Sequence, residues 1–286
     1  MKVAYLIRAH HAPSLLERIV RRLAGDEVGF FVHVSRSAEG AVYDEMAARL
    51  ADVDTVRWLP RRTCRYGGFS LVEATLSGID AIVAESADPG HTLLLSGQDY
   101  PLLGREAVEA RLGAAEEQSF VHHYALPAPE WRHERGGLDR IERIHLERLR
   151  YRTRILRVPL LRRRFPEGFR PYGGSAFWAL ATPALAYVHR FVRENPPFVS
   201  FFRHTLIPDE LFFQTILLNS PLRESVVNEE LHYVDWRAGT VQPATLSMTD
   251  LEPMLASGKL FARKLDPADT ELLDRLDEAA LSIGRT

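Results

Sequence analysis

The sequence has little cysteine, little net charge and no long apolar run. Cys64 is the single cysteine, which excludes an internal disulfide framework and thiolate zinc sites and is typical of a reducing compartment. The apolar run at 3–7 is too short for a signal-peptide core or a membrane span, and no later run is long enough. We therefore expect a cytoplasmic protein. Because the formal net charge is only -2, a polyanion would have to bind a local cluster of cations.

Two glycine-rich nucleotide-binding motifs, GxGxxG and GxxxxGK(S/T), are absent as well. A dinucleotide-binding fold and a P-loop therefore have no support. What is present is an ordinary globular composition, with 46% hydrophobic and 26% charged residues in a chain of 286. A chain of this length buries roughly 75% of its unfolded surface in one large domain or two close lobes.

Apolar runs alternate with helical patterns along the first third of the chain. Predicted strands cover 2–8, 29–34, 56–60 and 91–97, and predicted helices cover 14–23, about 40–51 and about 69–86. Later segments add a run at 173–181, helices near 183–194 and 209–219, and short runs at 231–236 and 260–266. Parallel strands need crossover connections and bury both faces, so this order predicts an α/β fold with a mostly parallel sheet flanked by helices.

Ligands of such sheets bind at the carboxyl ends of the strands. Asp99, in SGQDYP, follows the predicted strand at 91–97 and can either contact a ligand or close a turn. The histidine pairs at 10–11 and 122–123 point to opposite faces if they lie on strands, and no cysteine or carboxylate spacing completes a metal site around them. We interpret these histidines as structural or substrate-contacting and predict no metal site.

One DxD motif occurs, at Asp52 and Asp54, and many nucleotide-sugar enzymes hold a divalent ion with such a motif. It lies between a predicted helix and the start of a predicted strand, at the end of the sheet opposite the ligand edge. We therefore interpret it as a solvated loop.

The stretch IPDELFFQTILLN at 207–219 places two acids at the start of a helical pattern. Asp209 follows a proline and is predicted to cap the helix. Glu210 is then either a surface acid that gains from the helix dipole or a group with a chemical role. In LFARKLD, Arg263 and Lys264 face opposite ways on a strand, so taken alone they indicate surface charge.

Eight segments, in this order, resemble the core-2/I-branching β-1,6-N-acetylglucosaminyltransferase family, which includes the peptide O-xylosyltransferases. They are AYLIRAHHAP, FFVHVSRSA, RYGGFSLVEATL, LLLSGQDYPL, GGSAFWAL, PDELFFQTIL, VDWRAG and LFARKLD. The resemblance covers nearly the full length. It implies one domain over 1–286 of the GT-A type, with a nucleotide-binding half at 1–120 and an acceptor-binding and catalytic half at 121–286.

The resemblance also implies an activity: inverting, metal-independent transfer of a sugar, GlcNAc or xylose, from a UDP-sugar to an acceptor hydroxyl. Glu210 matches the family's general base, and Lys264, with Arg263 beside it, matches the cations that stabilise the leaving diphosphate. Trp236 matches a tryptophan that packs on the acceptor sugar. We expect the donor to lie near His10, Ser35 and Asp99, and we expect no cofactor.

The sequence departs from the family at several positions. Ser35 stands where the family has an aspartate near the uridine, and Tyr66 stands where a tryptophan usually precedes the double glycine. The family arginine upstream of the lysine has no counterpart, and Arg263 is expected to replace it. The membrane anchor and paired cysteines of the animal members are missing, which suits a bacterial cytoplasmic enzyme.

The segment 132–171 is rich in arginine and corresponds to the family's most variable part. Arg150 is our candidate there for an acceptor contact. Two other interpretations of the whole stretch are possible. It is either a solvated helix with paired Glu and Arg, or a phosphate-binding surface for a lipid-linked or other anionic acceptor. The second interpretation includes peripheral contact with a membrane.

Two other functions stay open. One is a metal-dependent nucleotide-sugar enzyme, a nucleotidyltransferase or hydrolase, and the other is a non-catalytic module that binds a polyanion through 132–171. The expected partners of the transferase are a nucleotide-sugar donor and a saccharide, lipid-linked or small-molecule acceptor, with no nucleic acid.

Overall fold

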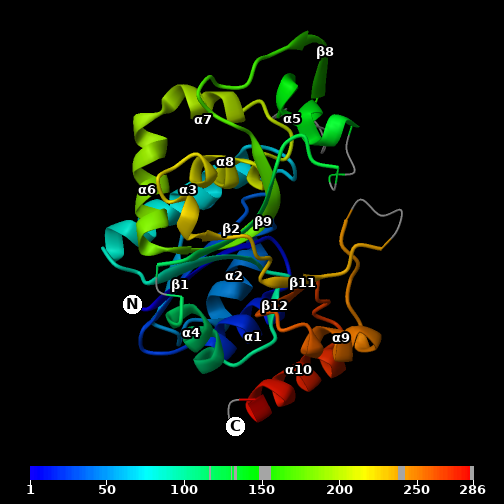
Figure 1. Cartoon of the computed structure of the whole chain (residues 1–286). Helices are drawn as coiled ribbons and strands as arrows, with labels where there is room; N and C mark the ends of the chain where they lie inside the picture. Colours follow the sequence, from blue (N-terminus) through cyan, green and yellow to red (C-terminus); the bar gives the residue numbers. More distant parts are fainter. Residues whose placement is uncertain (116, 130, 132–133, 148–155, 238–241, 284–286) are drawn as a thin grey trace.

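A seven-stranded sheet forms the centre of the molecule (Figure 1), in the order β10-β6-β9-β4-β1-β2-β3. The structure is a computed structural model, and it describes all residues except 116, 130, 132–133, 148–155, 238–241 and 284–286. The strands of this sheet are β1 Val3–Ala9, β2 Val28–Val34, β3 Val56–Trp58, β4 His91–Ser96, β6 Ser119–Ala125, β9 Tyr172–Ala181 and β10 Val226–Val227. Strand β9 runs antiparallel to β4 and β6, and the other pairs are parallel. The predicted α/β fold with a mostly parallel sheet is therefore confirmed.

Helices cover both faces of this sheet, and each face has its own hydrophobic core. The alternation of β1 shows why: Tyr5 and Ile7 enter one core, while Ala4 and Leu6 enter the other. The first core is completed by α1 Pro13–Leu23, α2 Gly40–Arg49, α4 Arg105–Gly113, α9 Leu251–Ala256 and α10 Thr270–Ile283. The second is completed by α3 Ser70–Glu85, α6 Thr182–Glu194, α7 Pro196–Phe202 and α8 Phe212–Leu218.

A small second sheet lies beside the first, in the order β11-β12-β5. Its strands are β5 Tyr100–Pro101, β11 His232–Val234 and β12 Phe261–Arg263. The short runs predicted at 231–236 and 260–266 are thus strands, and they pair in parallel. This sheet brings the C-terminal cations next to the turn that follows β4.

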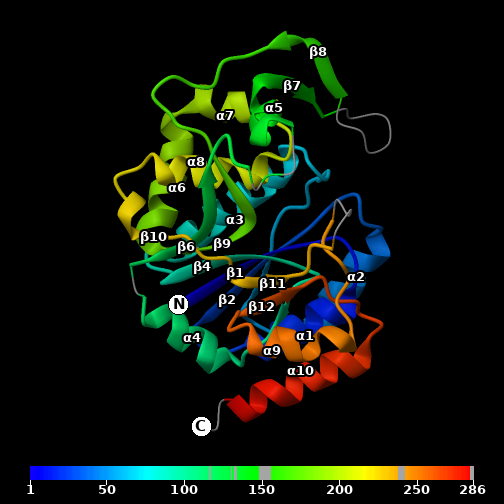
Figure 2. The ribbon, with the colours of Figure 1, turned by 45° about the vertical axis from the view of Figure 1, so that its right-hand side comes forward.

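The arginine-rich middle is not one long helix in the part that the structure describes. It contains a 3-10 helix, η1 Glu134–Gly137, the short helix α5 Leu138–Glu142, and a two-stranded antiparallel sheet of β7 Arg143–Leu146 and β8 Leu156–Arg162. The solvated-helix interpretation of this stretch is therefore wrong. Figure 2 shows α5, β7 and β8 at the end of the molecule farthest from α10.

The remaining short elements are the 3-10 helices η2 Pro208–Glu210, η3 Arg223–Ser225 and η4 Met248–Asp250. Among the described residues, no helix combines the length and apolar character needed to cross a bilayer. The division into halves at residue 120 stays a prediction.

Candidate active site

Three of the predicted donor-contacting residues lie along one edge of the main sheet. His10 follows β1, Ser35 follows β2, and Asp99 lies in the turn after β4. Because β1 pairs in parallel with both β2 and β4, these positions share the carboxyl edge.

Asp99 organises this edge from a fully buried position, with an exposed fraction of 0%. It accepts hydrogen bonds from the backbone N and the Oγ of Ser96, both at 2.7 Å, which closes the turn after β4. Its Oδ1 also accepts a hydrogen bond from Nε of Arg263 at 3.0 Å, and its Oδ2 lies 3.3 Å from Nε2 of His232. Burial acts to raise the pKa of Asp99, but Arg263 and His232 hold it down, at about 2. Asp99 therefore closes the turn and fixes Arg263; a direct contact with a donor stays a prediction.

Phe177, on β9, joins Arg263 to the segment that carries Glu210. The guanidinium of Arg263 lies over its ring, 4.1 Å from the centroid, and that of Arg8 lies 6.0 Å from it. Nη1 of Arg8 is in turn 3.5 Å from Oδ2 of Asp209, in η2. Strands β1, β9 and β12 thus meet η2 around one aromatic ring.

The predicted capping role of Asp209 is wrong. Helix α8 begins at Phe212, after the 3-10 turn, and neither of these two helices has a side-chain cap. Asp209 is buried, with 5% exposed, and pairs with Arg8 instead. Its tertiary partner comes from the end of β1, a contact that the local pattern of prolines and apolar residues does not reveal.

Glu210 is held by an arginine from the variable middle segment. Nη1 of Arg140, in α5, donates a hydrogen bond to Oε2 of Glu210 at 2.6 Å, and the side chains are 4% and 24% exposed. The guanidinium of Arg140 lies on the indole of Trp131, 4.1 Å from the ring centroid. Gly137 and Gly173 make room for that indole, since a Cβ at either position would overlap it. Trp131 and Arg140 thereby fix where the Glu210 carboxylate points.

Burial raises the pKa of Glu210 above its ordinary value, although Arg140 opposes the rise. Arg263 also acts to lower this pKa, so its charge is felt at Glu210. The desolvation of the carboxylate outweighs these nearby cations. A carboxylate with a raised pKa is a stronger base, which is what proton abstraction from a hydroxyl requires.

Lys264 extends the cationic group on the other side of Arg263. Burial lowers the pKa of Lys264, and the neighbouring charge of Arg263 lowers it further while Asp99 raises it. Nζ of Lys264 donates to Oε1 of Gln242 at 3.2 Å. Lys264 also contributes, after burial and His11, to lowering the pKa of His10, so His10 lies within its field.

His10 and His11 do not point apart as expected for neighbours on a strand. They lie just beyond β1, and their rings meet edge to face with centroids 4.2 Å apart. His10 is exposed and His11 is partly buried. The expectation of opposite faces is wrong because the strand has already ended.

Ser35 is buried, with 4% exposed, and its Oγ makes local hydrogen bonds. That oxygen accepts the backbone N–H of Cys64 at 3.1 Å and lies 2.7 Å from Oγ of Ser37. Its carbonyl accepts a hydrogen bond from Nη2 of Arg61 at 3.0 Å. Ser35 therefore shapes the loop after β3, and its predicted contact with a donor stays a prediction.

Two aromatic side chains are exposed near the ends of the loops. Trp236, just past β11, is 55% exposed, and Tyr66 is 68% exposed. The carbonyl of Gly67 accepts a hydrogen bond from the backbone N of Ile207 at 2.9 Å, which ties the Tyr66 loop to η2. Arg150, the other predicted acceptor contact, lies outside the described residues.

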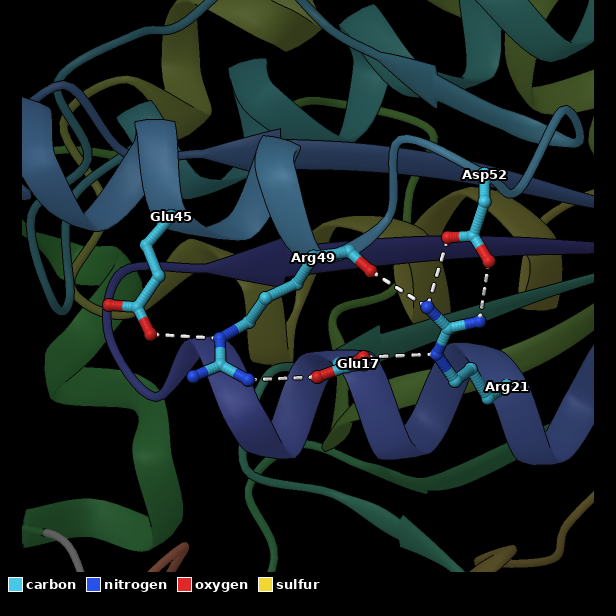
Figure 3. Close-up of polar contacts among 5 residues, drawn as sticks. All are labelled: Glu17, Arg21, Glu45, Arg49 and Asp52. Carbon is cyan, nitrogen blue, oxygen red and sulfur yellow. Dashed lines mark hydrogen bonds and ion pairs between the residues drawn. The ribbon is translucent and has the colours of Figure 1, made fainter.

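The DxD motif lies away from this site, as expected from its place before β3. Asp52 forms two hydrogen bonds with Arg21 at 2.9 and 3.0 Å, and Arg21 also binds Glu17 (Figure 3). Glu17 and Glu45 hold Arg49 from either side in the same surface network. Across the described parts of the chain, no three His, Cys, Asp or Glu side chains form a group that could hold a metal ion.

Arg8, Arg140, Trp131 and His232 were missed by sequence reasoning. Arg8 had a usable signal, because it is a charged residue at the end of an otherwise apolar strand. His232 and Arg140 had none, since each pairs with an acid far away in sequence, at positions 99 and 210.

The model of the Core-2/I-Branching enzyme family matches residues 3–257. The chain belongs to this family. Xylosyltransferase 2 of Rattus norvegicus is 28% identical over 246 residues, covering 82% of this chain and 27% of the relative. The β-glucuronosyltransferase GlcAT14A of Arabidopsis thaliana is 27% identical over 226 residues, covering 77% of this chain and 49% of the relative. The chain thus spans about a quarter of the xylosyltransferase and about half of the plant enzyme.

Proposed function

We propose that this member of the Core-2/I-Branching enzyme family is an inverting glycosyltransferase that uses a UDP-sugar and needs no metal ion. The observation that carries the proposal is the position of Arg263. It pairs with buried Asp99, lies next to Lys264 and also acts on the pKa of Glu210. Arg263 therefore interacts electrostatically with both the candidate base, Glu210, and the other candidate diphosphate-binding cation, Lys264.

The proposed chemistry is a direct displacement. Glu210 takes the proton of the acceptor hydroxyl. As it does so, the oxygen of that hydroxyl attacks the anomeric carbon from the face opposite the nucleotide. The bond from that carbon to the β-phosphate oxygen breaks, and UDP leaves with the bonding pair. Lys264 and Arg263 stabilise the charge that develops on the diphosphate, the task of a divalent ion in related sites.

The donor is proposed from the relatives. The family resemblance suggests UDP-GlcNAc as a candidate donor. The relatives named xylosyltransferase and β-glucuronosyltransferase suggest two more, UDP-xylose and UDP-glucuronic acid. Trp236 is proposed to stack on the acceptor sugar, since an exposed indole offers a flat apolar face to a pyranose ring.

The test begins with thermal shift against these three nucleotide sugars, because a ligand that binds only the folded state raises its stability. Turnover of the best donor is then measured with an excess of EDTA. Glu210→Gln should bind the donor normally and lose transfer by about 100-fold or more, while the exposed Glu224→Gln serves as the matched control. Activity that disappears in EDTA would support the metal-dependent alternative instead.

A further inference from the structure

The end of the molecule formed by α5, β7 and β8 carries arginines that form no ion pair with a described carboxylate. Four arginines have no ion-pair partner within the described ranges: Arg143, Arg162, Arg163 and Arg164. Glu142, which precedes Arg143 in the chain and lines the same cavity as Arg162 and Arg164, is paired with Arg135. The excess of cations is therefore local, in a chain whose net charge is only -2.

Two of these arginines are placed against each other. Arg143 and Arg162 are direct partners in the ladder of β7 and β8. Like charges directly opposite each other destabilise a sheet, so an anion that binds between them would relieve that cost.

Arg163 carries a second charge without a counterion. Its guanidinium donates to the carbonyls of Ile141 and Phe201 at 2.8 and 2.5 Å and to Oγ1 of Thr205 at 2.7 Å, all neutral acceptors. Burial lowers the pKa of Arg163 to about 10. Buried charge is normally paired, so this site favours a negative group nearby.

The same region exposes apolar surface. Leu146 on β7 is 39% exposed and Leu161 on β8 is 56% exposed. An open cavity of about 450 Å³ lies beside α5, and its apolar walls include Ile141 and Phe165 next to Arg162 and Arg164. Both views place this hairpin at an extremity of the molecule, where a flat surface can reach it (Figures 1 and 2).

We infer that this surface, formed by Arg143, Leu146, Leu161, Arg162 and Arg164, docks on the anionic phospholipid face of a membrane. The arginines would bind lipid phosphates, and the leucines and the apolar walls of the cavity would contact the acyl boundary. A nucleic acid or an anionic polysaccharide would use the charges but leave exposed leucines without a partner. The combination of arginine and leucine therefore favours a lipid.

The docking surface and the candidate active site share helix α5. Ile141 and Leu138 of this helix line the cavity, whereas Arg140 reaches Glu210. A membrane bound at the cavity would thus contact the same short helix that positions the Glu210 carboxylate. The inference does not depend on the proposed activity, and its test involves no turnover.

The experiment is co-sedimentation of the full chain with vesicles of phosphatidylcholine alone or with 30% phosphatidylglycerol. We expect binding only to the anionic vesicles, and we expect it to weaken in 0.5 M NaCl. The triple variant Arg143→Gln, Arg162→Gln, Arg164→Gln should bind about 100-fold more weakly, since each cation near an anionic surface contributes roughly fivefold. Arg163 is left intact because its hydrogen bonds hold α5 to α7.

The matched control removes three exposed arginines of α6 and α10 and gives the same net charge. The variant Arg190→Gln, Arg193→Gln, Arg275→Gln should bind the vesicles like the unmodified chain. Equal loss in both triple variants would show a general charge effect and overturn the inference. A cooperative thermal unfolding transition with an unchanged Tm confirms that each variant is folded.

The leucines separate a lipid from a soluble polyanion. Leu146→Ser with Leu161→Ser should weaken vesicle binding about tenfold or more and leave binding to heparin unchanged. Heparin binding as tight as vesicle binding, with vesicle binding insensitive to this double variant, would assign the surface to a polyanion and reject the membrane.

Discussion

The guanidinium of Arg140 lies 2.6 Å from Glu210 and on the face of Trp131, so the candidate base is positioned by the arginine-rich middle segment, far from it in sequence. Arg140 opposes the rise in the Glu210 pKa that burial causes, and this has two opposite consequences for catalysis. The lower pKa keeps the carboxylate ionised, which a base requires, but it also makes the carboxylate a weaker base. The balance between the two sets the pH at which Glu210 can accept a proton.

Arg140→Gln should move the acid limb of the kcat/KM profile to higher pH. Burial raises the pKa of Glu210 and Arg140 opposes this, so loss of the cation lets the pKa rise further. Arg140→Lys keeps a cation and should leave the limb near its original position with a lower kcat, since lysine lacks the planar group that rests on Trp131. The profile is measured from pH 5 to 9.

The neighbouring Arg143→Gln is the control for this series, because Arg143 has no described contact with Glu210. Its acid limb should coincide with that of the unmodified chain. An unmoved limb in Arg140→Gln would mean that Glu210 is not the group that titrates.

Asp99→Asn should weaken nucleotide binding and remove one pH dependence of stability. The pKa of Asp99 is about 2 in the fold and 3.8 in the reference state, so its stabilising effect is complete above about pH 4 and is lost as the pH falls through 2. This corresponds to about 2 kcal/mol. Urea unfolding from pH 2 to 6 should show the difference between the two proteins shrinking below pH 4.

The exposed Asp54→Asn is the control for Asp99. It should follow the stability curve of the unmodified chain at every pH. Curves for Asp99→Asn that stay parallel to the unmodified chain down to pH 2 would contradict the depressed pKa.

Lys264→Ala should weaken UDP binding about 10- to 100-fold, the usual loss for a hydrogen bond to a charged group. Lys2→Ala removes the same charge at the far end of β1, where Lys2 pairs with Glu27, and should leave UDP binding unchanged. Calorimetry in EDTA at low and moderate salt measures both. Equal affinities for UDP in the two variants would remove Lys264 from the site.

Trp236→Ala should raise the acceptor KM about tenfold, while donor hydrolysis without acceptor stays unchanged. Trp236→Phe keeps an aromatic face and should recover most of the loss. If both variants instead lower donor hydrolysis, Trp236 acts on the donor and the acceptor role is wrong.

Local patterns predicted the central fold because its elements have strong local signals. Strands β1, β2 and β4 are apolar runs buried on both faces, and the amphipathic periods of α1 and α3 are long enough to be unambiguous. The structure of the arginine-rich middle was predicted wrongly because its local signals are weak. Strand β7 alternates polar and apolar residues over only four positions, β8 does not sustain the alternation, and the charge of the segment suggested a solvated helix.

The site was predictable only where a residue followed a strand or matched a family motif. The positions of His10, Ser35 and Asp99 at the sheet edge followed from the order of strands and helices. The partners of Asp99 and Glu210 did not, because His232, Arg263 and Arg140 reach them through tertiary contacts. The role of Asp209 was predicted wrongly for the same reason, because it pairs with Arg8 and does not cap a helix.

Asp52→Asn tests whether the DxD motif holds a metal ion or is only a surface loop. Asp52 is bound to Arg21 in a network with Glu17 and Arg49, at the amino end of β3, whereas Glu210 and Lys264 belong to the opposite edge. The substitution should therefore change Tm only slightly, because exposed ion pairs contribute little. Transfer rates with EDTA and with added Mn²⁺ should match those of the unmodified chain. A variant that loses Mn²⁺-stimulated transfer would show that this loop holds a catalytic ion, and the roles given to Arg263 and Lys264 would then have to be reassigned.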